Sequence, residues 1–333
     1  MKRAAILYFT ERGEATAQRI AEAIRVDYEI EVYRPRGGEK QYVEPLFPVV
    51  DALIFVGACG IAVRAIAPFV KNKLTDPGVI VVDELGLQAI SLLSGHIGGA
   101  NELTRRIAAS IGAIPVITTA TDINHRFTAD EWAHNNNLSI ASMQAAKRFA
   151  TEILRRDLPV VSDFPIEGKL TGGLFRGSSG MNGLAISCRK CDAFDDPLVL
   201  IAKKLHVGIG CKRGTPMEKI HAAYMQAMKE NGIFFRAVAG AASIDAKQDE
   251  AGLLDFCRRW KLPVQFYSAD ELMAVQGDFT ASDFVKRTVG VDNVCERAAM
   301  LSAGENAKLI IKKTCLDGVT IAAAQEEWSV CFE

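Results

Sequence analysis

Four loops of this chain combine glycines with a basic side chain, a combination that suits the binding of an anion. Glycine lets a ligand approach the backbone closely, and arginine or lysine supplies the charge that a carboxylate or phosphate needs. Four such loops predict a ligand with several negative groups. The alternative is that the glycines only form tight turns and the cations lie in water. The residues expected to bind the ligand in these loops are Gly57, Gly60, Arg64, Gly95, Gly98, Gly99, Asn101, Arg176, Gly210 and Lys212.

His96 and Glu84 are the candidate catalytic residues. His96 lies in one of the glycine loops, and an imidazole titrates near neutral pH, so it can serve as a general base or acid. The alternative is a histidine that binds a neighbouring backbone carbonyl. Asp83 and Glu84 end an apolar strand, where a carboxylate reaching the same crevice could orient a water molecule. The alternative for both acids is a solvated turn before Gly86.

Two further pairs of residues are candidates, one for ligand binding and one for nucleophilic chemistry. Asp245 and Lys247 follow a small apolar strand, and we expect both to contact the ligand, although Asp245 could simply cap a helix. Cys59 and Cys211 each lie in a glycine turn before a helix, where a thiolate is stabilised. Buried packing is the more common role for such a thiol, and we expect no covalent catalysis.

Apolar strands that alternate with helices must position these loops. Residues 4–9, 28–33, 52–56, 79–82 and 115–118 are expected strands, and helices are expected at 14–25, at 60–67 and around Leu103, Ile107 and Ile111. This rhythm predicts an α/β fold with a Rossmann-like N-terminal unit and a parallel sheet covered on both sides. A middle segment and a separate α/β C-terminal domain follow, and the expected domains are 1–120, 121–197 and 198–333.

Capping boxes support the helices of the C-terminal domain. Thr215 with Glu218, and Ser268 with Glu271, have the spacing at which a hydroxyl and a carboxylate satisfy the first free N–H groups of a helix. Both are predicted helix starts.

Composition restricts the class of function. With 333 residues, 49% hydrophobic and 24% charged, the chain is a folded protein of several domains. Its 39 basic and 40 acidic residues give a net charge of -1, so we expect neither a nucleic-acid nor a membrane partner. The apolar run at the N-terminus is too short for a signal peptide, and the expected location is the cytoplasm. The scattered cysteines fit reduced, buried thiols, and the CxxC formed by Cys188 and Cys191 lacks partner ligands for zinc.

Standard nucleotide motifs do not explain the glycine loops. The first βα turn lacks GxGxxG, and GxxxxGK[ST] occurs nowhere. Only FTERGEAT, residues 9–16, is faintly similar to a flavodoxin phosphate loop. A nucleotide- or flavin-binding protein therefore remains an alternative with little support.

The sequence resembles the CbiG family of cobalt-precorrin-5A hydrolases, which act in anaerobic cobalamin biosynthesis. The likeness spans nearly the whole chain and is looser only before Val49 and in the middle ribbon. The segments that carry it are GACGIAVRAIAPFVKNKLTDPGVIVVDE (57–84), ISLLSGHIGGANELTRRIA (90–108), ITTATD with DEWA (117–133), VGIGCKRGT (207–215), ASIDAKQDEAGL (242–253), FYSADEL (266–272), VDNVCERAA (291–299) and KTCLDGVTIAAA (313–324).

This resemblance implies a reaction and a substrate. The family opens the δ-lactone formed by the ring A acetate of a cobalt corrinoid and releases acetaldehyde, giving cobalt-precorrin-5B. Cobalt-precorrin-5A has many acetate and propionate groups, which agrees with several cationic loops. Cobalt arrives with the substrate, so no cofactor or bound metal is expected. Handover to corrin methyltransferases and a homodimer are the further partners it implies.

Within that reaction we expect His96 or Glu84 to be the base. The backbone N–H groups of the Gly57 to Gly60 or Gly95 to Gly99 turn would stabilise the oxyanion. The competing hypothesis is a carrier that binds the corrinoid without catalysis. Such a carrier needs the cationic loops but no positioned base.

Overall fold

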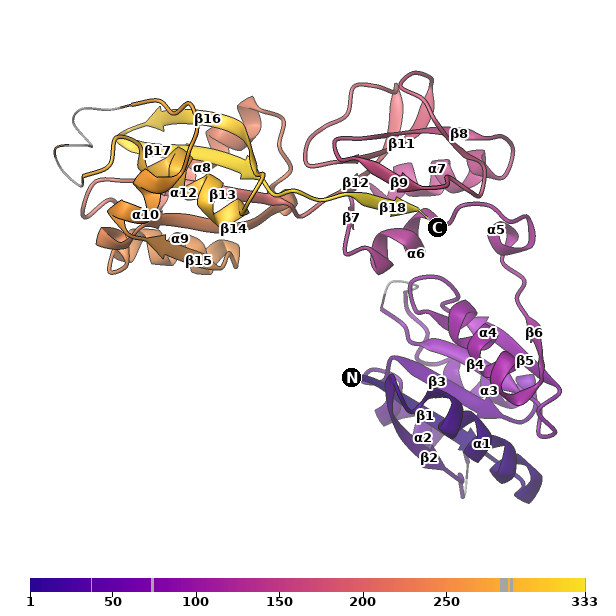
Figure 1. Cartoon of the computed structure of the whole chain (residues 1–333). Helices are drawn as coiled ribbons and strands as arrows, with labels where there is room; N and C mark the ends of the chain where they lie inside the picture. The colour runs from indigo at the N-terminus through magenta and orange to yellow at the C-terminus, as the bar shows by residue number, and fades with distance from the viewer. Residues whose placement is uncertain (37, 73–74, 282–286, 288–289, 333) are drawn as a thin grey trace. The chain divides into compact units, whose positions relative to one another are not determined.

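The chain folds as two compact units, Met1–His134 and Asn135–Glu333. The computed structural model describes all residues except 37, 73–74, 282–286, 288–289 and 333 (Figure 1). Strands and helices alternate in both units, which confirms the predicted α/β class. Among the described residues, no helix combines the length and apolar character needed to cross a membrane.

A six-stranded sheet forms the centre of the N-terminal unit, in the order β2-β1-β3-β4-β5-β6. Helices α1 (Glu11–Ile24) and α4 (Ala100–Ile111) pack on one face, and α2 (Lys40–Leu46) and α3 (Cys59–Ile66) on the other. The middle strands are buried on both faces for this reason, which explains their continuous apolar sequences. The strands are β1 (Lys2–Tyr8), β2 (Tyr28–Tyr33), β3 (Ala52–Val56), β4 (Gly78–Val82), β5 (Gln88–Leu93) and β6 (Ile114–Val116).

One strand pair departs from the predicted parallel sheet. β5 runs antiparallel to β4, with Val82 opposite Ala89, whereas the other neighbouring pairs are parallel. The turn between them is too short for a crossover, so the chain must reverse. Asp83 stabilises this turn, because its carboxylate accepts the N–H groups of Leu85, Leu87 and Gln88 at 2.9, 2.9 and 2.5 Å. Asp83 therefore builds the turn before Gly86, which was the stated alternative to a crevice acid.

The N-terminal unit extends beyond the boundary expected after residue 120. Helices α5 (Ala120–Ile123) and α6 (Ala129–Asn135) follow β6, and Ala129 and Ala133 are buried. Asp122 binds side chains of the unit's own loop and helix, as described below. Residues 121–134, assigned from sequence to a middle segment, thus fold onto the N-terminal unit.

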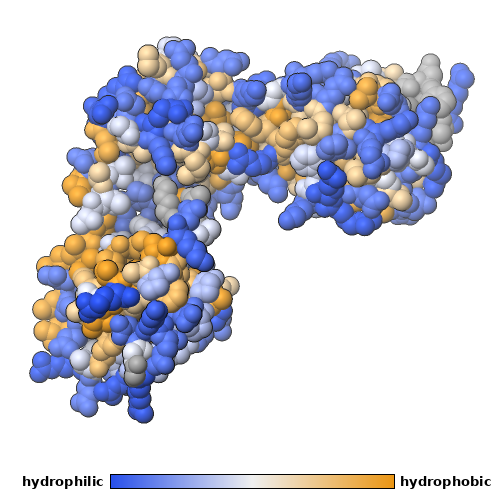
Figure 2. Space-filling model, turned by 180° about the vertical axis from the view of Figure 1, so that it is seen from behind, coloured by the Kyte–Doolittle hydropathy of each residue, from blue (hydrophilic) through white to orange (hydrophobic). Residues whose placement is uncertain are grey.

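Apolar side chains also gather on one face of this unit (Figure 2). Leu87 and Ile114, at the β5–β6 end of the sheet, are 59% and 66% exposed. The edge strands are thus less completely covered than the central ones.

The second unit contains two larger sheets. The first has the order β10-β8-β11-β12-β7, parallel except for β7, and α7 (Met143–Ile153) packs against it. A strand at the chain's end, β18 (Val330–Phe332), pairs with β9 (Ile166–Gly168), so the C-terminal end returns to the middle segment. The remaining strands are β7 (Ser139–Ile140), β8 (Leu158–Ser162), β10 (Leu174–Arg176), β11 (Asn182–Ser187) and β12 (Asp196–Ile201).

The other sheet has the order β15-β14-β13-β17-β16, in which β13, β14 and β15 are parallel. The Ser268–Glu271 capping box is confirmed, but the one expected at Thr215 is wrong. There, Pro216 is the N-cap, and the Thr215 hydroxyl donates to the Lys212 carbonyl. The elements are β13 (Leu205–Gly210), α8 (Met217–Glu230), the 3₁₀ turns η1 (Phe235–Ala237) and η2 (Asp245–Lys247), β14 (Val238–Ile244), α9 (Ala251–Trp260), β15 (Val264–Tyr267), α10 (Ala269–Ala274), α12 (Val294–Ala303), β16 (Lys308–Leu316) and β17 (Val319–Gln325).

Glu296, in the first turn of α12, is a fully buried carboxylate that joins three segments. One oxygen accepts the Thr280 backbone N–H at 2.7 Å and the Asn293 amide at 2.6 Å. The other accepts the Lys313 backbone N–H at 2.7 Å and the Thr280 hydroxyl at 3.1 Å. Four donors offset the cost of burying the charge, and they fix α12 to β16.

We predict that Glu296→Gln lowers the free energy of unfolding of the second unit by about 3 kcal/mol, because one oxygen facing two donors becomes a third donor. Urea unfolding followed by tryptophan fluorescence measures this change. The matched control is Glu230→Gln on the exposed end of α8, expected to change stability by less than about 0.5 kcal/mol. Equal effects of both substitutions would contradict this role for Glu296.

Candidate active site

The two glycine turns of residues 53–106 lie at opposite ends of the strands of the N-terminal sheet. Gly57 follows the carboxyl end of β3, and its N–H donates to the Val82 carbonyl at 2.8 Å. The Ser94–Gly99 loop follows β5, whose last residue, Leu93, pairs with Val79 at the other end of β4. The five residues of β4 separate the two turns by about 13 Å along the strand. The two turns therefore open at opposite ends of β4 and do not form one crevice.

Glu84 lies at the same end of β4 as Gly57, next to Thr10. Its carboxylate accepts the Thr10 hydroxyl at 2.7 Å, and its carbonyl accepts the Thr16 hydroxyl at 2.8 Å. In the same region Arg64 folds back over Gly60, where an added Cβ would lie 3.3 Å from the guanidinium. Glu84 and His96 are thus at opposite ends of β4 and cannot act together on one bond.

Close backbone packing explains the glycines of the Ser94–Gly99 loop. A Cβ at Gly98 would lie 2.4 Å from that of Ser94, and one at Gly95 would lie 2.6 Å from the Asn101 amide oxygen. Gly99 has a φ of +73°, which disfavours other residues. The Asn101 N–H donates to the Gly95 carbonyl at 2.9 Å, and that of Gly99 to the His96 carbonyl at 2.8 Å. This tight loop holds His96 above the start of α4.

His96 lies between two carboxylates. Its Nε2 is 3.1 Å from Asp122 Oδ2, and its Nδ1 is 3.7 Å from Asp130 Oδ1. An ionised carboxylate only accepts hydrogen bonds, so the neutral ring donates its proton from Nε2 to Asp122. Nδ1 then keeps a free lone pair. These are side-chain contacts, so the alternative of a simple backbone-bound histidine is wrong.

Asp122 is the centre of the hydrogen-bond network. Besides His96 it accepts the Thr119 hydroxyl at 2.6 Å and the Asn101 amide at 3.0 Å, and it forms an ion pair with Arg105. Burial raises the pKa of this carboxyl, but the hydrogen bonds from Thr119, His96 and Arg105 outweigh burial and bring the pKa below its ordinary value. Asp122 is therefore an ionised anchor for the imidazole.

Asn101 supports this network and is itself only 1% exposed. Its amide nitrogen donates to Thr119 and Asp122, both at 3.0 Å, and its oxygen accepts the Ser91 hydroxyl at 2.7 Å. The side chain is thus bound within the protein. Asn101, predicted to bind substrate, lies where it positions Asp122 instead.

Asp130 and Glu131 in α6 belong to the same cluster and were not predicted as site residues. The Asp130 carboxylate accepts the Glu131 N–H at 3.1 Å. Burial raises the pKa of Glu131, and the charges of Asp122 and Asp130 raise it further, whereas Arg105 and the protonated form of His96 oppose this effect. The signal for them was the DEWA segment, in which two adjacent acids precede an aromatic residue.

In the second unit, four of the predicted residues share one sheet edge. β13 and β14 are parallel, so Gly210 and Lys212 lie at the same edge as Asp245 and Lys247. The Lys247 ammonium is 3.3 Å from a Glu250 carboxylate oxygen, and the other oxygen accepts the Gly214 N–H at 2.8 Å. This arrangement brings cationic groups of two loops together. Burial raises the pKa of Cys211 in the same turn, which disfavours a thiolate nucleophile there.

Arg176 belongs to the middle sheet. It ends β10, and its guanidinium donates to the Ile166 carbonyl at 2.8 Å. The four glycine loops are thus distributed over three sheets, and one of them, the His96 loop, follows β5, which is antiparallel to β4.

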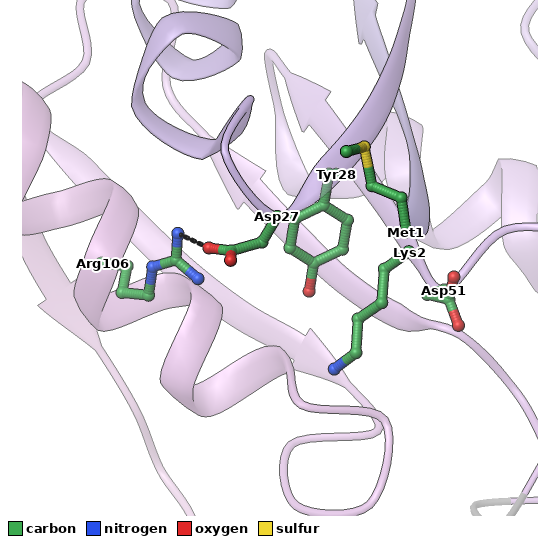
Figure 3. A pocket seen from close by; sticks show the side chains of 6 residues that line it. All are labelled: Met1, Lys2, Asp27, Tyr28, Asp51 and Arg106. Atoms are coloured by element: carbon green, nitrogen blue, oxygen red, sulfur yellow. Dashed lines mark ion pairs between the residues drawn. The ribbon is translucent and has the colours of Figure 1, made fainter.

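An open cavity of about 640 Å³ lies where β1, β2 and β3 begin (Figure 3). Arg106 reaches it from α4 and forms an ion pair with Asp27 at 2.7 Å. The lining has two basic and two acidic side chains, so it does not favour an anion by charge. The residues are Met1, Lys2, Asp27, Tyr28, Asp51 and Arg106.

Comparison with known proteins places this chain in a family. The model for the N-terminal part of cobalamin synthesis protein G matches residues 41–122, and that for its C-terminal part matches 205–324. The cobalt-precorrin-5A hydrolase of Salmonella typhimurium is 32% identical over 326 residues, covering 90% of this chain and 92% of the relative. The chain belongs to the CbiG family. The resemblance read from the sequence is confirmed.

Two further relatives support the CbiG assignment. The cobalt-precorrin-5A hydrolase of Priestia megaterium is 31% identical, covering 86% of this chain and 82% of the relative. A shorter relative, protein CobE of a Sinorhizobium species, is 32% identical over 121 residues, covering 36% of this chain and 79% of the relative. The His96 loop and Asp122 fall within the N-terminal family match.

We predict that Asp122→Asn removes a pH-dependent contribution to stability. Because the folded pKa is lowered, the contribution is complete above the ordinary value of 3.8 and is lost as pH falls through the folded value. At pH 7 the substitution should cost about 2 kcal/mol, since four donors lose an ionised acceptor. Urea unfolding at pH 7 and in acid measures both effects.

The control for this experiment is Asp270→Asn, at an exposed position of α10. It should leave stability within about 0.5 kcal/mol of the wild type at either pH. If Asp122→Asn were equally neutral at pH 7, Asp122 would not be an ionised anchor.

Proposed function

We propose that this protein is a cobalt-precorrin-5A hydrolase, which opens the δ-lactone of the ring A acetate and releases acetaldehyde to give cobalt-precorrin-5B. Similarity to the Salmonella typhimurium enzyme over 92% of its length carries the proposal. The His96–Asp122 pair supports it, because lactone hydrolysis needs a positioned base.

His96 acts as the base in this scheme. A water molecule at Nδ1 loses its proton to the ring while its oxygen adds to the lactone carbonyl. Asp122 holds the ring through Nε2 and stabilises the imidazolium that forms, the role that a carboxylate has in a catalytic triad. Glu84, the other predicted base, lies at the opposite edge of the sheet and has no part in this step.

Two of the backbone donors considered for the oxyanion are already in use. The N–H of Gly57 donates to Val82, and that of Gly99 donates to His96. We therefore exclude these two from oxyanion stabilisation and keep the remaining N–H groups of the His96 loop as the candidates.

The substrate is a polycarboxylate, and the cationic loops suit its acetate and propionate groups. Arg64, Arg176, Lys212 and Lys247 are the side chains that we propose for this binding. The cobalt is part of the substrate, and the scheme uses no cofactor. Action in the cytoplasm, handover to corrin methyltransferases and assembly as a homodimer are further parts of the proposal.

We predict that His96→Ala lowers the rate of acetaldehyde release by about 10²- to 10⁴-fold, because the general base is lost. The measurement is anaerobic incubation with cobalt-precorrin-5A and an assay of acetaldehyde. His134→Ala, at an exposed site of α6, is the matched control and should keep the wild-type rate.

Substrate binding, measured by the change in corrinoid absorbance, distinguishes a loss of catalysis from a loss of folding. The His96→Ala variant should still bind cobalt-precorrin-5A. A wild-type protein that binds cobalt-precorrin-5A but releases no acetaldehyde would be a carrier, contrary to this proposal. A fully active His96→Ala variant would leave the hydrolase intact and remove His96 from it.

A further inference from the structure

A cavity of about 820 Å³ lies in the second unit, where α8 ends and the chain turns toward β14. Its lining is mostly apolar and comes from the last turns of α8, from residues 232–236 and from Lys190, between β11 and β12. Of the described residues that line it, none belongs to the four glycine loops. Cavities of this volume and character commonly bind small molecules. The cavity is therefore a candidate site separate from those loops.

Aromatic and thioether side chains form the floor of this cavity. Met225, Phe234 and Phe235 are half-buried, so each retains surface that a ligand can contact. The Phe235 ring packs against Trp260, with the ring centroids 5.3 Å apart. Aromatic rings bind other flat, apolar groups by stacking or edge contacts. The floor therefore favours a ligand with a flat, apolar face.

Backbone hydrogen bonds hold the floor in place. The Phe234 N–H donates to the Cys188 carbonyl at 3.0 Å, and the Lys190 N–H donates to the Gly232 carbonyl at 3.0 Å. These bonds tie the segment after α8 to the segment after β11. Because the cavity is formed before a ligand arrives, binding does not have to order the chain.

Basic side chains surround the apolar floor. Lys190, Lys229 and Arg236 are exposed there, against one acidic side chain, that of Glu230, whose carboxylate accepts the Gln226 amide at 2.8 Å. Within the described part of the chain, none of the three cations forms an ion pair. The rim thus has an excess of positive charge, unlike the cavity of Figure 3, whose basic and acidic side chains are equal in number.

We propose that this cavity binds a polycarboxylate corrinoid, with the macrocycle against Phe234 and Phe235 and its carboxylates at Lys190, Lys229 and Arg236. An apolar plane bordered by anionic groups is complementary to an apolar floor bordered by cations. A fatty acid has a single carboxylate and would leave two of the cations unpaired. The inference rests on the substrate class proposed above, but not on the reaction, and it gives the second unit a corrinoid site of its own.

The first test measures binding of cobyrinic acid, a stable cobalt corrinoid whose side chains are carboxylates, to the whole chain by equilibrium dialysis. The double variant Lys190→Gln/Lys229→Gln should raise the Kd about three- to tenfold, since two exposed ion pairs are lost. The matched control, Lys147→Gln/Lys308→Gln, removes the same charge at exposed positions outside the cavity. Its Kd should stay within about twofold of the wild type, because salt screens distant charges.

Lysine acetylation followed by mass spectrometry locates the bound probe. Saturating cobyrinic acid should slow the acetylation of Lys190 and Lys229, because an ammonium group paired with a carboxylate is less reactive. Acetylation of Lys147 and Lys308 should not change. In Phe234→Ala the protection should be weaker at the same probe concentration, because a ring contact with the macrocycle is lost.

An unchanged Kd in the double variant Lys190→Gln/Lys229→Gln would overturn this site, as would equal acetylation of both lysines with and without the probe. A dimeric protein that protects them without the probe would assign the cavity to a second copy of the chain, which also overturns it. A wild type that protects both lysines with the probe but releases no acetaldehyde from cobalt-precorrin-5A would overturn the hydrolase proposal and support this site.

Discussion

The antiparallel pairing of β4 with β5 is the constraint on which the candidate site depends. It turns the chain round after Val82, so that β5 and β6 deliver their carboxyl ends to the edge where β4 begins. The loop after β5 carries His96, and the segment after β6 carries Asp122. Since these two strands are parallel neighbours, the imidazole and its anchor meet without any long connection.

Much of the fold could be predicted because its signals are local. Buried strands, glycine turns and the Ser268 capping box depend on residues within a few positions of one another. Strand β5 was not among the predicted strands, and its direction rests on one carboxylate, that of Asp83, which closes a short turn. At Thr215, Pro216 occupies the N-cap position, so the local pattern predicted a box that the backbone does not form.

Only part of the candidate site could be predicted from the sequence, because its other residues are distant from His96 along the chain. His96 stands out because glycines surround it, whereas its partner Asp122 is 26 residues away and its other acidic neighbour, Asp130, lies further on. The polar segment that contains both acids is typical of a surface linker. Only the folded chain, in which Asn101 and Arg105 of α4 reach Asp122, shows that these acids face a histidine.

The position of Asp122 also sets the shortest N-terminal fragment that keeps the candidate site. Polar contacts of Asp122 join α5 to the first unit, and Asp130 of α6 lies 3.7 Å from His96 of the same unit. A recombinant fragment that stops where the regular sheet ends, after β6, would contain every strand of the unit and yet lack the anchor of its histidine. Anyone who wishes to express, swap or graft this half of the protein should therefore cut after His134.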